Sequence, residues 1–77
     1  MHRGAGTVYL IVLRGELSER YAAAFEEMEM ETKGGLTVLT GGVVDQVQLH
    51  GIIDRIGGLG LELVSVQSLP EGIQSEA

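Results

Sequence analysis

The sequence predicts an α+β domain in which a four-stranded antiparallel sheet carries two helices on one face. Three observations lead to this prediction. Four short segments are rich in β-branched residues or alternate between apolar and polar residues, two others repeat apolar residues at helical spacing, and they follow one another as strand, helix, strand, strand, helix, strand. Because 77 residues make one domain at most, the strands are expected to share one sheet.

The first strand is predicted at residues 7–14, TVYLIVLR, where β-branched and aromatic residues dominate and Gly15 follows. The first helix is predicted at residues 19–27, with Ser18 as its N-cap and Glu19 near the positive end of the helix dipole. Its core-facing side is expected to consist of residues three or four positions apart: Leu17, Tyr21, Ala24, Phe25 and Met28.

A β-hairpin is predicted in the middle of the chain. Residues 28–32 alternate between Glu and less polar side chains, which is the period of a half-buried strand. Lys33-Gly34-Gly35 predicts a tight turn, because glycine tolerates the positive φ angles of a two-residue hairpin loop. Residues 36–40 are the return strand, and Gly41-Gly42 is expected to end it.

The second helix is predicted to begin after Asp45, an N-cap that has Gln48 in the capping-box position. Gly57-Gly58 is expected to end it. The last strand is predicted at residues 61–67, LELVSVQ. The core-facing side of the helix is expected to consist of Leu49, Ile52, Ile53 and Ile56.

Right-handed crossovers between these elements favour the strand order 4-1-3-2, which is the arrangement of a ferredoxin-like βαββαβ plait. The domain is expected to span residues 7–68. Residues 1–6 and 69–77 are expected to be a flexible N-terminus and a flexible tail.

The first and last strands are apolar on both sides, although two helices cover only one face of a sheet. A chain this small has a thin core, so the second face is expected to be covered by another copy in at least a dimer. Edge-to-edge pairing of two last strands is the alternative geometry, and Leu61 and Leu63 are the alternative outward set in the last strand. The expected interface residues are Val8, Leu10, Val12, Val64 and Val66.

Composition argues against several classes of protein. The formal charge of −6 argues against binding to nucleic-acid backbones or anionic membranes. With no cysteine and only His2 and His50, neither disulfides nor a structural zinc site is expected, and no cofactor is predicted. The apolar run at residues 7–13 is too short for a signal peptide or a membrane span, so a cytoplasmic location is expected.

A candidate ligand site lies on the second predicted helix. His50 has Asp54 one turn after it and Gln46 one turn before it, which is the spacing of an acid–base pair or of half a metal site. No catalytic residue is predicted, because no nucleophile and no third metal ligand accompany them. The competing interpretation is structural, with His50 packed against the rim of the sheet and hydrogen-bonded locally.

Three segments carry a resemblance to known proteins: residues 42–53 (GVVDQVQLHGII), 59–66 (LGLELVSV) and 13–18 (LRGELS). Together they resemble a family of small uncharacterised bacterial proteins with an Asp-Gln-x-x-Leu-His-Gly segment, here Asp45 to Gly51. The resemblance covers most of residues 8–66 and implies no particular activity. The order of elements is also similar to that of ACT regulatory domains, which bind small ligands at subunit interfaces.

Three hypotheses about function follow. The first is a non-enzymatic, self-associating domain that acts as a binding or regulatory module, with a small ligand or a protein as its further partner. The second is a small dimeric α+β-barrel enzyme of the cyclase or cofactor-free monooxygenase type, whose site would lie between helices and sheet. The third is a purely structural assembly protein.

Overall fold

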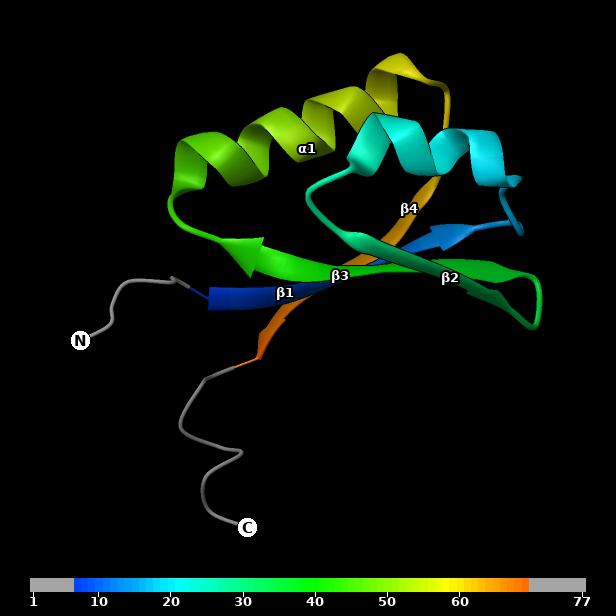
Figure 1. Cartoon of the computed structure of the whole chain (residues 1–77), viewed down its shortest axis with the longest axis horizontal. Coiled ribbons are helices and arrows are strands. Elements are labelled where there is room, and N and C mark those ends of the chain that lie inside the picture. The colour runs from blue at the N-terminus through cyan, green and yellow to red at the C-terminus, as the bar shows by residue number, and fades with distance from the viewer. Residues whose placement is uncertain (1–6, 70–77) are drawn as a thin grey trace, which may run out of the picture.

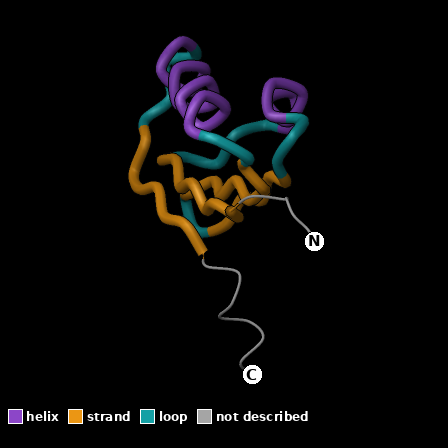
Figure 2. The backbone as a smooth tube through the Cα atoms, turned by 90° about the vertical axis from the view of Figure 1, so that its left-hand side faces the viewer, coloured by secondary structure: helices purple, strands orange, loops and turns teal. Residues whose placement is uncertain are grey.

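The computed structural model describes residues 7–69, whose strands form one sheet with both helices on the same face (Figures 1 and 2). This arrangement confirms the predicted α+β class. The expectations for residues 1–6 and for the tail after Leu69 lie outside the described residues. The elements in chain order are β1 (Thr7–Arg14), the 3₁₀ helix η1 (Glu19–Phe25), β2 (Glu29–Lys33), β3 (Leu36–Val43), α1 (Gln46–Gly58) and β4 (Leu63–Leu69).

The sheet is antiparallel throughout and has the order β2-β3-β1-β4. Counted from the opposite edge, this order is 4-1-3-2. The strand that is apolar on both sides, β1, therefore lies in the interior of the sheet, and β2 and β4 are its edges.

The core lies between the sheet and the two helices. It is built from alternate residues of the central strands, such as Ile11 and Leu13, and from one side of each helix. The hairpin turn matches the prediction, since Gly34 and Gly35 both have positive φ angles, 57° and 84°. The buried hydrophobic residues are Ile11, Leu13, Phe25, Met28, Leu39, Val43, Ile52 and Ile56.

The first helix differs from the prediction, because it is a 3₁₀ helix and not an α-helix. The Ser18 side chain makes no capping hydrogen bond, and the flanking bonds join residues three apart, from the N–H of Tyr21 to the carbonyl of Ser18 and from Met28 to Phe25. An uncapped helix of seven residues gains little from the α geometry. Its apolar side still packs as expected, with Phe25 and Met28 buried.

Strand β3 does not end at Gly41-Gly42 as expected but continues through both glycines to Val43. A Cβ added at Gly41 would lie 3.0 Å from the carbonyl oxygen of Glu27 and from the Cγ of Met28. Gly41 therefore lets the η1–β2 connection approach the strand closely, which is one of the reasons for glycine inside a strand.

Both ends of α1 are capped. The Asp45 carboxylate accepts the N–H of Gln48 at 2.9 Å, which confirms the predicted N-cap. At the other end, Gly57 and Gly58 are not the terminating glycines but the last helical residues. Gly60, with a φ of 74°, is the glycine that terminates the helix. Its N–H donates to the carbonyl of Gly57, and the N–H of Leu61 donates to the carbonyl of Ile56, as in a Schellman motif.

Strand β4 begins two residues later than predicted and runs to Leu69. Its register against β1 shifts near its start: Val12 pairs with Ser65, whereas the next residue, Leu13, pairs with Leu63. This β-bulge leaves Val64 as the extra residue, and it changes which side chains of β4 face the helices.

Candidate functional site

The candidate site is the face of the sheet that the helices leave uncovered, called here the open face (Figure 1). On β1, Ile11 and Leu13 are buried under the helices, so the alternate residues point to the open face. Residues that pair across neighbouring strands share a face, which extends the set to β3 and β4. The apolar residues of the open face, called here the apolar stripe, are Val8, Leu10, Val12, Leu36, Val38 and Leu69.

The apolar stripe is only partly shielded within one chain. Leu10, Val12 and Val38 are half-buried by their neighbours in the sheet, while Val8 is 37% and Leu69 is 40% exposed. Side chains packed only from the side by their own sheet still present their tips to solvent. The open face is thus a continuous apolar surface and not a scatter of single residues.

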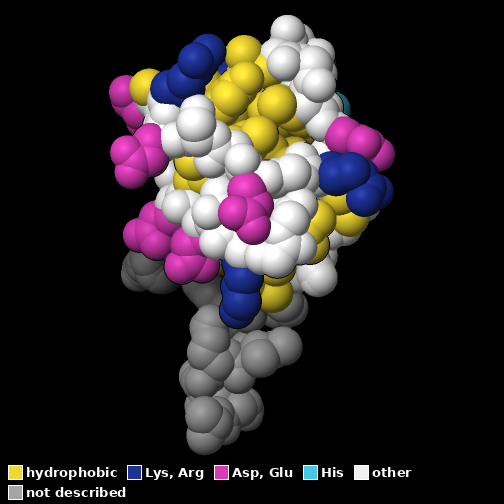
Figure 3. All heavy atoms as spheres, turned by 90° about the vertical axis from the view of Figure 1, so that its right-hand side faces the viewer, with side chains coloured by type: hydrophobic (Ala, Val, Ile, Leu, Met, Phe, Trp, Pro, Cys, Tyr) yellow, Lys and Arg dark blue, Asp and Glu magenta, His cyan; other side chains and the backbone are white. Residues whose placement is uncertain are grey.

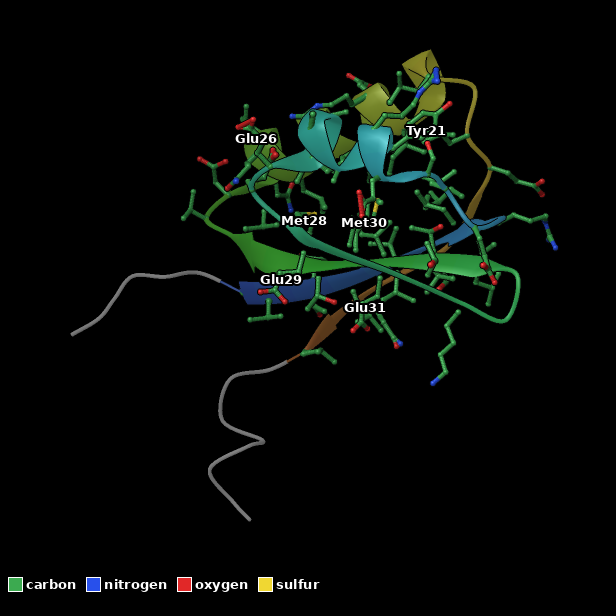
Figure 4. The ribbon with its side chains drawn as sticks, turned by 45° about the vertical axis from the view of Figure 1, so that its right-hand side comes forward. Tyr21, Glu26, Met28, Glu29, Met30 and Glu31 are labelled. Carbon is green, nitrogen blue, oxygen red and sulfur yellow. The ribbon has the colours of Figure 1, made fainter. Side chains whose placement is uncertain are left out.

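Polar residues border the apolar stripe on both sides. One row across the sheet runs Glu31, Val38, Val12 and Ser65, and the next runs Glu29, Thr40, Leu10 and Gln67. The border on β2 carries Glu29 and Glu31 in these two rows and Lys33 in the row beyond them, whereas the border on β4 is uncharged. Figure 4 shows Glu29 and Glu31 on the open face, whereas Met28 and Met30 point between the sheet and the helices.

The β1 residues expected at the interface, Val8, Leu10 and Val12, lie on the open face, whereas those expected from β4 do not. Val66 pairs with Ile11 and packs against the core, on the helix side. Val64 lies at the bulge and is 45% exposed. The bulge is the physical reason, because one extra residue reverses the alternation that follows it.

Leu69 lies on the open face although the sequence did not predict it there. It pairs with Val8 at the end of β4. The signal for it would have been the apolar residue just before Pro70, but the predicted strand ended at Gln67.

The candidate ligand residues His50, Gln46 and Asp54 are exposed on the outer side of α1. His50 was expected to pack against the sheet rim in the structural interpretation, and its exposure contradicts that expectation. The helix turns this side outward because Ile52 and Ile56 occupy the buried side. Among the hydrogen bonds and ion pairs of residues 7–69, none joins these three side chains.

An ion pair joins α1 to the segment that follows η1. The Arg55 guanidinium donates to both carboxylate oxygens of Glu27, at 3.2 and 3.1 Å, and also donates to the carbonyl of Ala24. The guanidinium carbon of Arg55, Cζ, lies 5.6 Å from the centre of the Phe25 ring. The hydrogen bonds from Arg55, helped by a backbone N–H, hold the pKa of the Glu27 carboxyl below its ordinary value.

Other kinds of site find little support in the part of the chain that the structure describes. Residues 7–69 form no detectable pocket and bring together no three His, Asp or Glu side chains as metal ligands. None of the helices in this range is long and apolar enough to cross a membrane. Figure 3 shows the end of the molecule near the hairpin turn, where acidic side chains line one side and hydrophobic ones gather at the helical end. Leu59, the C-cap residue that follows α1, is 41% exposed.

Residues 7–69 define a small α+β domain in which both helices cover the same face of the sheet. The chain belongs to the family described as "Domain of unknown function (DUF8691)", which matches residues 8–67. No curated protein and no solved structure matches the chain.

Proposed function

We propose that this domain is a non-enzymatic self-association module, built as a ferredoxin-like plait, whose open face packs on the open face of a second copy. The observation that carries the proposal is the apolar stripe, which crosses three adjacent strands at the centre of a face that no helix or strand of residues 7–69 covers. In the dimer, Val8, Leu10 and Val12 would lie in the middle of the interface. As a binding or regulatory module, the domain would act by holding two copies of the chain next to each other.

The size of the open face fits such an interface. Four strands spaced about 4.8 Å apart, with a rise of about 3.4 Å per residue, give a face of roughly 500 Å². Two such faces in contact would remove about 1,000 Å² from water, which is near the lower limit of specific interfaces. A weak or moderate dimer is therefore expected, formed at micromolar concentration.

The charges of the open face favour one orientation of the two copies. A two-fold axis parallel to the strands lays β2 of one copy over β4 of the other, so that Glu31 meets Ser65 and Glu29 meets Gln67. A two-fold axis across the strands would bring β2 over β2 and oppose carboxylates. The first orientation keeps Glu29 and Glu31 of one copy away from those of the other, and like-charge contacts destabilise an interface.

Leu10→Glu tests the proposal. It would bury an unpaired charge in the interface, at a cost of several kcal/mol, and should lower the mass that light scattering measures relative to the unmodified chain. Val8→Lys is a second variant at a more exposed position, chosen in case Leu10→Glu unfolds. Val47→Glu is the matched control. It also replaces an apolar residue with Glu, but Val47 is 78% exposed on α1, away from the open face. A monomeric unmodified chain, or a Val8→Lys chain that associates like the control, would contradict the proposal.

A further inference from the structure

The two edges of the sheet are built differently. Edge strand β2 has five residues, and Glu29, Glu31 and Lys33 are charged. Edge strand β4 has seven residues, LVSVQSL, and none is charged. Charged side chains and short length protect natural edge strands against pairing with other chains. By this criterion β2 is protected and β4 is not.

Within residues 7–69, no strand pairs with the outer side of β4. The N–H of Arg14 donates to the carbonyl of Glu62, so Arg14 points its backbone groups toward β4. Backbone direction alternates along a strand, so Val12 and Leu10 also point toward β4 and bond their partners Ser65 and Gln67. The residues between these partners, Val66 and Ser68, must then point their N–H and C=O groups away from the sheet.

We propose that β4 is a second interface, independent of the open face, at which β4 of another copy pairs antiparallel to extend the sheet. The bulge at Val64 confines this pairing to the regular segment of residues 65–69. A register centred on Gln67 is the one that uses the whole segment. In it Val66 and Ser68 of the two copies exchange both backbone hydrogen bonds.

The side chains of this register are compatible on both faces. Gln67 meets Gln67 of the second copy, and two amides can each donate to and accept from the other. Ser65 meets Leu69, and Val66 meets Ser68. No charged side chain of β4 opposes the pairing, and the second copy supplies the same uncharged edge. The occupant of the edge is therefore another copy of this chain.

Ser68→Pro tests the edge, and Ser68→Ala is its matched control. Proline at position 68 removes an N–H that points outward, so the ladder between β1 and β4 stays intact. Alanine keeps the N–H and should change nothing. Used together, the open face and the edge build assemblies larger than a dimer. We therefore expect the unmodified chain to exceed a dimer in light scattering, and Ser68→Pro to leave dimers held by the open face.

Leu10→Glu separates the two proposals, because it disables only the open face. The edge proposal predicts that Leu10→Glu chains remain dimers and that adding Ser68→Pro gives monomers. Hydrogen exchange gives a second measurement: the Val66 amide should exchange about tenfold or more slowly in the Leu10→Glu dimer than in the double variant. A monomeric Leu10→Glu chain, or equal exchange at Val66 in both, overturns the edge proposal. If Leu10→Glu matches the unmodified chain in mass and Ser68→Pro is monomeric, the edge stands and the open face is wrong.

Discussion

Thr37 shows how much of this fold depends on one hydroxyl. It is fully buried on β3, and its Oγ1 donates to the carbonyl of Gly15 at 2.7 Å while accepting the N–H of Leu17 at 3.0 Å. The two bonds hold the loop between β1 and η1 against the sheet. Glu16 adds a third attachment, because its carboxylate accepts the N–H of Gly35.

We expect Thr37→Val to lower the free energy of unfolding by about 2 kcal/mol, because it leaves the half-buried N–H of Leu17 and the half-buried C=O of Gly15 without their partner. Urea unfolding followed by circular dichroism measures the change. Thr37→Ser keeps the hydroxyl and is the control. A serine variant that loses more stability than the valine variant would show that the methyl group matters and the hydroxyl does not.

For single residues, a hydrogen bond can be predicted from the sequence when its donor and acceptor lie close together along the chain. The cap of α1 joins Asp45 to Gln48, three residues later, and such a short-range pattern is readable in the sequence. The hydroxyl of Thr37 bonds residues 20 and 22 positions away. Nothing in the local pattern of a threonine in a strand predicts those partners, since the sheet alone brings them together.

At the scale of elements, Arg55 and Glu27 join α1 to the segment that follows η1. The Glu27 carboxyl has a folded pKa below its ordinary value of 4.5. A carboxyl of this kind stabilises the fold above its unfolded pKa, and the contribution disappears as the pH falls through the folded pKa. The two side chains are 38% and 32% exposed, so the contribution at neutral pH should not exceed about 1 kcal/mol.

We therefore expect Glu27→Gln to reduce the free energy of unfolding at pH 7 and to have a smaller effect at about pH 3, because the contribution of this carboxyl decreases once the pH falls below its unfolded pKa. Urea unfolding at both pH values measures the difference between variant and unmodified chain. Glu26→Gln, which removes the same charge one residue away, is the control. A difference that stays the same size at both pH values would mean that Glu27 acts through packing and not through its charge.

The elements themselves were predicted well where their signals are local and less well where tertiary contacts decide. The hairpin turn at Gly34 and Gly35 and the start of α1 follow from short patterns. The continuation of β3 through Gly41 depends on the η1–β2 connection, which packs against that glycine. The bulge in β4 is likewise a matter of register with β1.

At the scale of the whole molecule, the open face was predictable because double apolar alternation in β1 is visible in the sequence. Which residues of β4 lie on the open face was not predictable. The bulge shifts the register by one residue, which places Val66 against the core and Leu69 on the open face. The same register that corrects the face also defines its charges. It places Glu29 and Glu31 on the β2 border and leaves the border on β4 uncharged, and this asymmetry makes the orientation of the proposed dimer testable.

Ser65→Lys tests that orientation. Within one copy, Ser65 and Glu31 lie in the same row but are separated by β1 and β3, about 14 Å in a sheet, where salt screens their interaction. In the proposed dimer the new lysine would meet Glu31 of the second copy. An exposed ion pair is worth about 0.2–1 kcal/mol, and the dimer contains two of them by symmetry, so the dissociation constant should fall by about 2- to 30-fold. Sedimentation of Ser65→Lys, Glu31→Gln and the double variant, each combined with Ser68→Pro so that only the open face associates, forms a cycle that isolates this pair. Coupling should appear at low salt and fade at high salt, whereas independent effects of the two changes would reject this orientation of the two copies.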